Sequence, residues 1–139
     1  MEITANALQT VAANQNVLFT ETAVKGNCSI IHREGSGLVT LRGITDQCRA
    51  RFRVSFGGNV AIPTGGTVGP ISIALAINGE AVGPATAIST PAAVEEFNNV
   101  YVSVFLDVPC ACCYTISVTN LTGTDIEVQN ANLIVERVA

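Results

Sequence analysis

Short runs of β-branched, aromatic and other apolar residues alternate along the whole chain with turn-forming Gly, Asn, Pro and Asp. Within many of these runs every second position is apolar, which is the period of a strand with one buried face. No segment carries apolar residues at the spacing of an amphipathic helix. The pattern therefore predicts an all-β protein of about ten short strands. These strands are expected at residues 8–12, 17–22, 29–33, 37–42, 49–56, 71–77, 80–88, 99–108, 113–120 and 126–138.

Two stretches of turn residues organise these strands. Asn78-Gly79 separates two apolar runs, and this dipeptide supplies the two positive φ angles of a type I′ hairpin turn. We therefore expect the strands on either side of it to pair. Residues 57–70 are rich in glycine and proline, which weaken a central strand, so this stretch predicts a connection between two sheets. The expected architecture is an antiparallel jelly-roll sandwich.

Composition adds the expectation of an assembly. The chain has 139 residues, near the size of one domain, so we expect a single domain over residues 1–139. Residues 1–15 are interpreted either as a first strand or as an attachment segment. Charged residues make up only 13% of the chain and hydrophobic ones 48%, which excludes disorder. So few charges cover a monomer's surface poorly, and part of the surface is expected to be hidden in an oligomer or larger particle.

The charge pattern excludes several partners. The net charge is −4 with a single Lys, so we expect no nucleic acid and no anionic membrane as partner. The longest uncharged run, residues 54–79, is interrupted by glycines and prolines and does not predict a membrane-spanning helix. The amino terminus carries Glu2 where a signal peptide carries basic residues, so folding in a cytoplasm is expected.

The cysteines are the first candidates for chemistry. They are Cys28, Cys48, Cys110, Cys112 and Cys113. An odd number without an export signal does not predict a complete disulfide framework. Cys28 and His32 would lie about 13 Å apart on an extended segment, whereas zinc needs donor atoms about 2.0–2.3 Å away. We therefore predict no metal site and expect the thiols to be buried as small apolar groups, with a Cys28–Cys48 bridge or an inter-subunit cluster as alternatives.

Groups for acid–base catalysis are few. The chain has one His and lacks the Gly-x-Ser-x-Gly, phosphate-loop and His-Glu-x-x-His motifs. The adjacent carboxylates Glu95 and Glu96 are interpreted as solvated loop residues. The sequence therefore predicts no enzyme, no catalytic residue and no cofactor.

One stretch of charge is patterned. Arg49, Arg51 and Arg53 alternate with apolar residues, so on a strand they share one face. Such a stripe could bind a carboxylate-bearing partner, such as an acidic capsid surface or a sialic-acid-like sugar. The alternative is an exposed or inter-subunit ladder that is paired with acidic residues. The candidate acidic partners are Glu95, Asp107 and Glu136.

The strand expected at residues 99–108 is a candidate interface. Its odd-numbered positions from Tyr101 to Asp107 alternate with a Val and Leu set, and either set could face the core. Tyr101 and Phe105 are therefore the interaction candidates, and a charge at Val104 or Phe105 should disrupt either the core or an interface.

Three segments together resemble a known family. They are the closing strand Asn130-Ala131-Asn132-Leu133-Ile134-Val135-Glu136-Arg137-Val138-Ala139, the hairpin at 73–82 with its Asn78-Gly79 turn, and Arg51-Phe52-Arg53-Val54-Ser55-Phe56. In these, the chain resembles the globular carboxy-terminal domain of BclA-type collagen-like exosporium glycoproteins, over roughly residues 38–139. This resemblance implies a tumour-necrosis-factor-like and complement-head-like jelly roll that assembles as a tight homotrimer around an apolar axis.

The resemblance also sets the functional expectation. The chain lacks that family's collagen stalk and spore-targeting leader, and is also similar to small phage-encoded structural proteins. We therefore expect a homotrimer that folds in the host cytoplasm and is displayed on a phage virion, as a capsid-decoration or fibre-head protein in contact with a capsid or other particle protein. The alternatives are a spore-surface protein and a carbohydrate-binding adhesin that binds a cell-surface glycan. Aromatic residues make up only 5% of the chain, without Trp, which disfavours sugar stacking.

Overall fold

The computed structural model describes residues 1–45, 47–110 and 113–139, and within them the regular structure consists of eleven strands. Among these described residues there is no helix that is long and apolar enough to cross a membrane. The strands are β1 (Glu2–Ala5), β2 (Gln9–Val11), β3 (Glu21–Val24), β4 (Ile30–His32), β5 (Val39–Arg42), β6 (Arg49–Ala61), β7 (Ile71–Ile77), β8 (Glu80–Ser89), β9 (Asn98–Pro109), β10 (Cys113–Asn120) and β11 (Ile126–Arg137).

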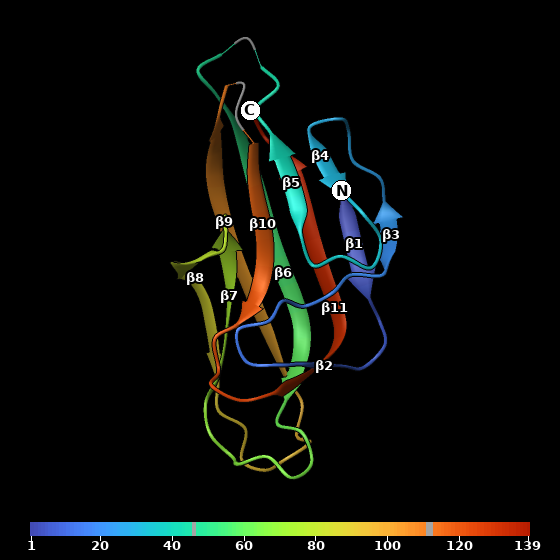
Figure 1. Ribbon diagram of the computed structural model, residues 1–139, viewed down its shortest axis with the longest axis vertical. Coiled ribbons are helices and arrows are strands. Elements are labelled where there is room, and N and C mark those ends of the chain that lie inside the picture. Colours follow the sequence, from blue (N-terminus) through green and yellow to red (C-terminus); the bar gives the residue numbers. More distant parts are fainter. Residues whose placement is uncertain (46, 111–112) are drawn as a thin grey trace.

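The strands form two antiparallel sheets that pack face to face (Figure 1). The first sheet has the order β3-β1-β11-β6-β9, and β2 pairs with the early part of β11. The second sheet has the order β4-β5-β10-β7-β8. The predicted all-β sandwich is confirmed, with eleven strands in the described residues where about ten were expected.

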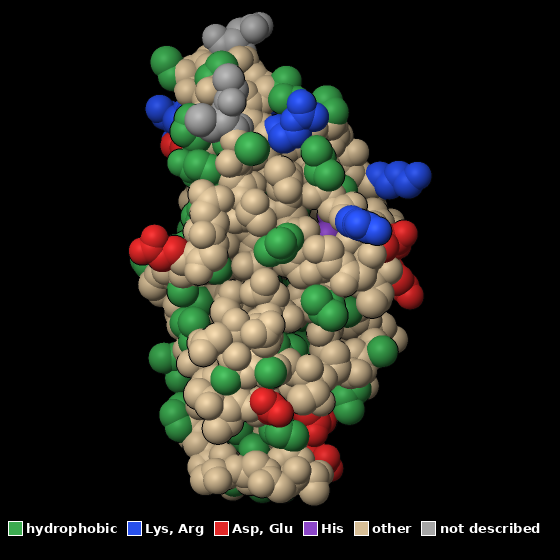
Figure 2. Space-filling view, viewed as in Figure 1, with side chains coloured by type: hydrophobic (Ala, Val, Ile, Leu, Met, Phe, Trp, Pro, Cys, Tyr) green, Lys and Arg blue, Asp and Glu red, His purple; other side chains and the backbone are tan. Residues whose placement is uncertain are grey.

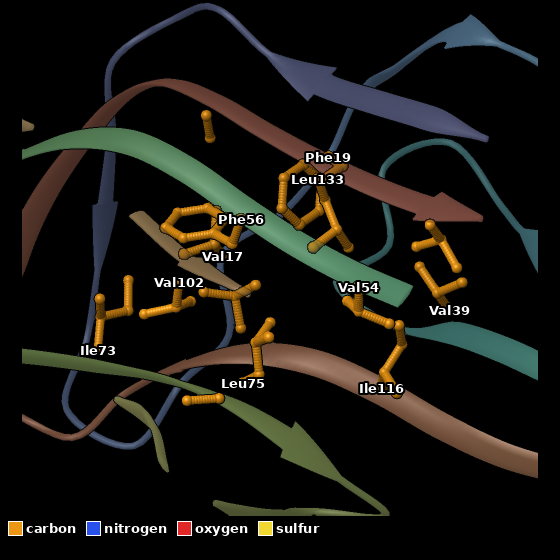
Figure 3. Packing of buried hydrophobic residues seen from close by; sticks show 14 of the residues in the cluster. Val17, Phe19, Val39, Val54, Phe56, Ile73, Leu75, Val102, Ile116 and Leu133 are labelled. Carbon is orange, nitrogen blue, oxygen red and sulfur yellow. The ribbon is translucent and has the colours of Figure 1, made fainter. Parts of the chain in front are cut away.

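The core lies between the two sheets and follows the period-2 pattern of the sequence. Figure 3 shows Val54 and Phe56 of β6 facing Leu75 of β7 and Ile116 of β10 across this layer. Each of these side chains is almost fully buried, and burying one such side chain contributes about 1.5–3 kcal/mol. Phe19 packs edge-on against Phe56, with ring centroids 6.4 Å apart.

The Asn78-Gly79 turn is confirmed. The two residues have φ angles of 53° and 84°, and β7 pairs with β8 directly beside them through Ile77 and Glu80. The Asn78 backbone and side chain also bond to Thr115 of β10, so the turn is held against the neighbouring strand.

Two strand predictions were wrong in their bounds. Residues 17–20 are not a strand, and β3 begins only at Glu21. The apolar residues alternate there because Val17 and Phe19 are buried in the core although they lie in a loop. The backbone N–H groups of these two residues bond to the carbonyls of Val118 and Ser36. The strand predicted at residues 49–56 continues through Ala61, so the connection between the sheets begins only at residue 62. Gly57 and Gly58 remain in the strand because aromatic rings of Tyr101 and Phe56 lie beside them.

Residues 1–15 contribute two strands to the first sheet. β1 lies between β3 and β11, with Ile3 opposite Leu133, and both of these side chains are fully buried. β2 pairs with β11 farther along that strand. The exposed part of this segment consists mainly of the turns on either side of β2.

Candidate functional site

The five interaction candidates lie together on the outer surface of the first sheet. Here the term β6–β9 face means the outward-facing residues in the part of these two strands between the Arg49 end and the Gly57–Tyr101 pair. They are Arg49, Arg51, Arg53, Ser55 and Gly57 of β6 and Tyr101, Ser103, Phe105 and Asp107 of β9. Antiparallel register places Arg53 opposite Phe105, Gly57 opposite Tyr101 and Arg51 opposite Asp107. In the described residues β9 is the last hydrogen-bonded strand of this sheet, and β8 of the second sheet packs near it without pairing.

The structure decides which set of β9 side chains faces outward. Val100, Val102, Leu106 and Val108 are buried, whereas Tyr101 is 59% exposed and Phe105 is 63% exposed. Two large aromatic side chains therefore stand in solvent on one face, separated by the small side chain of Ser103. Aromatic residues this exposed are typical of protein interfaces.

Each arginine of the stripe has an acidic partner within the chain. Asp107 lies 3.0 Å from the Nε of Arg49 and 2.8 Å from the Nε of Arg51, and a second bond at 3.2 Å makes the Arg51 contact bidentate. Arg53 lies 3.7 Å from Glu136 of the adjacent strand β11. The predicted pairing with Asp107 and Glu136 is confirmed.

The predicted pairing of the stripe with Glu95 was wrong. This carboxylate lies in the loop before β9 and accepts a hydrogen bond of 2.5 Å from Thr64 Oγ1 in the connection between the sheets. The reason is one of register: the loop that carries Glu95 leads into the Asn98 end of β9, whereas the arginines pair with its Pro109 end.

These ion pairs shift the titration of the groups involved. The hydrogen bond and the charge of Arg51 lower the pKa of Asp107 below its usual range, and the charge of Arg49 adds to this. The same contact raises the pKa of the Arg51 guanidinium above its ordinary value. Both groups are exposed, so solvent screens the interaction, and its role is to fix the positions of the side chains.

Small side chains lie between the two exposed aromatics. A side chain added at Gly57 would place its β-carbon 3.7 Å from Tyr101 Cδ2, so the ring covers the glycine of the opposite strand. The hydroxyls of Ser55 and Ser103 lie 3.0 Å apart beside it. The pKa of the Tyr101 phenol is lowered by side-chain hydrogen bonding, first from Ser55 and then from Ser103, and by the nearby Arg53. The centre of the β6–β9 face is therefore a low polar strip between two rings.

Two hollows flank the Arg51 side chain. One has a volume of about 350 Å³ and is lined by Arg51, Phe105, Leu106 and Asp107. The other has a volume of about 210 Å³ and lies toward Cys48, Arg49 and Ala139. Phe105 therefore stands at the rim of a depression.

Sequence reasoning missed a chain of amides beside Tyr101. Asn99 donates to Asn59 at 3.3 Å, Asn59 donates to Asn130 at 3.0 Å, and Asn130 donates to Asn6 at 2.6 Å. We call these four residues the amide ladder. They come from segments far apart in the sequence, and Asn130 has a φ of 56° at a bulge in β11. The register of the sheet, which the sequence does not specify, brings them together.

The prediction of buried cysteines was wrong. Cys28, Cys48, Cys110 and Cys113 are free and exposed, and Cys112 lies outside the described residues. Cys113 is the first residue of β10, and the other three lie just outside strand ends, so the core does not reach them. Cys48 has Cys110 as its backbone partner, through an N–H to carbonyl bond of 3.1 Å, rather than Cys28.

The Cys28 and His32 pair forms no metal-ligand cluster in the described residues. His32 Nε2 is hydrogen-bonded to the Ser36 carbonyl at 2.9 Å, and its Nδ1 is buried without a partner. Within residues 1–45, 47–110 and 113–139 there is no group of three His, Cys, Asp or Glu side chains that could hold a metal ion.

The opposite surface of the molecule is of a different kind. Figure 2 views the protein from the side of β5 and β10, and hydrophobic side chains there are scattered among the backbone and other side chains. The Lys and Arg side chains that this view shows lie in its upper half. Ile88 of β8 is the most exposed large apolar side chain of the second sheet, at 70%.

Comparison with known proteins identifies the fold. No known protein family and no curated protein matches the chain. It is similar to the globular domain of the zebrafish complement 1qA protein, with a TM-score of 0.56 and 12% identity over 96% of this chain and 93% of that chain. The described sandwich is thus an antiparallel jelly roll of the complement-head and tumour-necrosis-factor-like type, as the sequence resemblance implied.

Two further structures align over most of the chain with lower scores. One is a family 35 carbohydrate binding module from an environmental isolate, with a TM-score of 0.43 and 13% identity over 100% of this chain and 98% of that chain. The other is the EclA C-terminal domain, a sugar-binding protein, with a TM-score of 0.37 and 11% identity over 84% of this chain and 89% of that chain.

Proposed function

We propose that the protein is a non-enzymatic structural module that forms a homotrimer through the β6–β9 face and is displayed on a phage virion, as a capsid-decoration or fibre-head protein. The observation that carries the proposal is the exposure of Tyr101 and Phe105 on the outside of an edge strand. The resemblance to trimeric jelly rolls supplies the expected assembly, and the low share of charged residues agrees with a partly covered surface.

The β6–β9 face has the composition that a protein interface needs. Burying a charge without a partner is costly, but Arg49, Arg51 and Arg53 already have carboxylate partners in their own chain. Tyr and Arg are the residues that dominate binding energy at interfaces, particularly next to depressions that anchor a side chain. A second copy can therefore cover this face without leaving an uncompensated charge.

The particle is the second part of the proposal. The buried position of β1 leaves the turns on either side of β2 as the available contact region in residues 1–15. We expect the purified protein to sediment with phage capsids that lack it. Sedimentation with spores but not with capsids would replace the virion by the alternative spore-surface location.

Absolute mass in solution tests the trimer directly. Light scattering at two concentrations that differ about tenfold should give three times the chain mass of 14.4 kDa at both. A mass of one chain at both concentrations would refute the assembly.

Charged substitutions locate the interface. Phe105→Asp should reduce the mass to that of a single chain while the circular dichroism of the sheet is retained, because Phe105 is not part of the core. Ile88→Asp is the matched control, since it places the same charge at a similarly exposed apolar position on the second sheet. A trimer that survives Phe105→Asp, or is lost with Ile88→Asp, would place the interface elsewhere.

A carbohydrate-binding module is the second candidate function, and the amide ladder is the observation that favours it. Planar amides can donate to and accept from sugar hydroxyls, and an exposed aromatic ring beside them, here Tyr101, can stack on a pyranose. Tyr101 belongs to both candidates, so a trimer that covers it excludes glycan from it. The Phe105→Asp chain should bind on a glycan array, and adding Tyr101→Ala should abolish that binding. An array on which neither chain binds would reject this function.

A further inference from the structure

Beyond self-association, we propose that Cys48 and Cys110 form an intrachain disulfide when the protein meets a low-molecular-weight disulfide such as oxidised glutathione. The inference concerns the end of the sandwich next to the β6–β9 face and does not depend on the trimer. It rests on the positions of two free, exposed thiols at adjoining strand ends.

The two residues are direct cross-strand neighbours. The last described pair of the β6–β9 ladder is Arg49 with Pro109, and the next position along both chains is Cys48 with Cys110. The Cys110 N–H donates to the Cys48 carbonyl at 3.1 Å, which shows that the register continues to this pair. Hydrogen-bonded antiparallel partners have α-carbons about 5.5 Å apart, within the range of about 4.4–6.8 Å that disulfides span.

The two side chains also lie on the same side of the sheet. Successive side chains of a strand alternate between faces, so Cys48 shares a face with buried Ala50, and Cys110 shares it with buried Val108. At this end the core has stopped, and both thiols are accessible to a small oxidant. Cys110 Sγ bonds to the Thr45 carbonyl at 3.2 Å, so a rotation about its χ1 angle must precede bond formation.

The other described thiols are placed differently. Cys113 is opposite Arg42 of β5 in the second sheet, and the Cys28 carbonyl accepts a hydrogen bond from the same arginine. Neither residue is the cross-strand partner of Cys48 or Cys110. The geometry therefore selects one pair among the described cysteines.

The chemistry is two steps of thiol–disulfide exchange. The thiolate of one cysteine attacks oxidised glutathione, forming a mixed disulfide and releasing one glutathione thiolate. The second cysteine thiolate attacks the sulfur of the first, so the Cys48–Cys110 bond forms and a second glutathione thiolate leaves. Two protein thiols are oxidised and one glutathione disulfide is reduced to two thiols. The product joins the loop before β6 to the segment after β9 and closes a long loop of chain.

The test uses full-length chains that retain only two cysteines. In the test chain Cys28, Cys112 and Cys113 are replaced by Ser, which leaves Cys48 and Cys110. The matched control replaces Cys28, Cys110 and Cys112, which leaves Cys48 and Cys113. Both are incubated with oxidised glutathione under native conditions, then analysed by intact mass and by non-reducing electrophoresis.

The test chain should lose two hydrogens in mass without gaining glutathione and without cross-linking to another chain. Its thermal unfolding midpoint should rise by several degrees and return on reduction. The control chain should form at least about tenfold less internal disulfide, because its thiols are not cross-strand partners. The proposal is overturned if the test chain remains a dithiol, stops at the mixed disulfide or cross-links between chains, or if the control closes equally well.

Discussion

Asp107 is the residue on which the charges of the β6–β9 face depend, because its two carboxylate oxygens bind Arg49 and Arg51. A strand pattern in the sequence was sufficient to place the arginines on one face and to name Asp107 as a partner. It was not sufficient to show that one carboxylate serves two arginines, since that depends on side-chain reach across the ladder.

The lowered pKa of Asp107 predicts the pH range in which these contacts act. A carboxyl group whose folded-state pKa lies below its ordinary 3.8 stabilises the folded protein above that value. This stabilisation is lost as the pH falls through the folded-state pKa. A titration followed by carboxyl carbon NMR should give Asp107 a midpoint below pH 3.8. The stability difference between the protein and its Asp107→Asn variant should shrink as the pH falls through that midpoint. An ordinary pKa for Asp107 would contradict the bidentate contact.

Gly79→Ala tests the energetic cost of the turn conformation at one residue. It has a φ of 84° with open space around it, so Gly79→Ala meets no neighbouring atom but forces alanine into the left-handed region. We expect a loss of about 1 kcal/mol in the free energy of unfolding by urea denaturation. Gly83→Ala is the control, because its surroundings are equally open and its φ is not positive. An equal loss at both positions would mean that the turn conformation is not what the substitution disturbs.

The strands themselves were the part of the fold that the sequence predicted best. The bounds of β7 and β10 are those expected, because Pro70 and Asn78-Gly79 delimit the apolar run of β7 and Gly123 and Asp125 follow that of β10. β6 was predicted too short because two glycines normally end a strand, and the ring of Tyr101 that covers Gly57 comes from another element. β1 is short and lacks clear turn signals, and its pairing with β11 is a long-range contact.

Asn120 joins two elements at the end of the core, and its replacement should be costly. Its fully buried side-chain amide donates to the carbonyls of Val11, Ala12 and Thr124, and its oxygen accepts from Thr122 N–H. Asn120→Ala leaves these buried groups without a partner and should lower the free energy of unfolding by about 2–4 kcal/mol.

The matched control for this prediction is Asn98→Ala. Asn98 begins the edge strand β9, and its side chain makes no hydrogen bond to the described part of the chain. The expected loss there is within about 0.5 kcal/mol in the same chemical denaturation experiment. Comparable losses at Asn98 and Asn120 would show that the amide does not link β10 to β2.

At the scale of the whole molecule, the sequence predicted the sandwich and the face of each strand on which the candidates lie, but not that the two sets lie side by side. The alternation in residues 49–54 and 99–108 placed Arg53 and Phe105 on strand faces, and the structure brings these faces side by side. The amide ladder and the Cys48–Cys110 neighbourhood could not be predicted. Both depend on the register between segments distant in the chain, which a pattern within one strand does not encode.

The response of the assembly to salt follows from how the charges are used. If Arg49, Arg51 and Arg53 are paired within each chain, the trimer is held by the burial of Tyr101 and Phe105, and apolar burial does not weaken in salt. The mass by light scattering should then be unchanged from about 0.1 M to about 1 M NaCl, where the Debye length falls from about 10 Å to about 3 Å. If the arginines instead hold an acidic surface of a neighbouring copy, the same titration should dissociate the trimer. That outcome would keep the assembly but move its driving force from the aromatic residues to the arginine stripe.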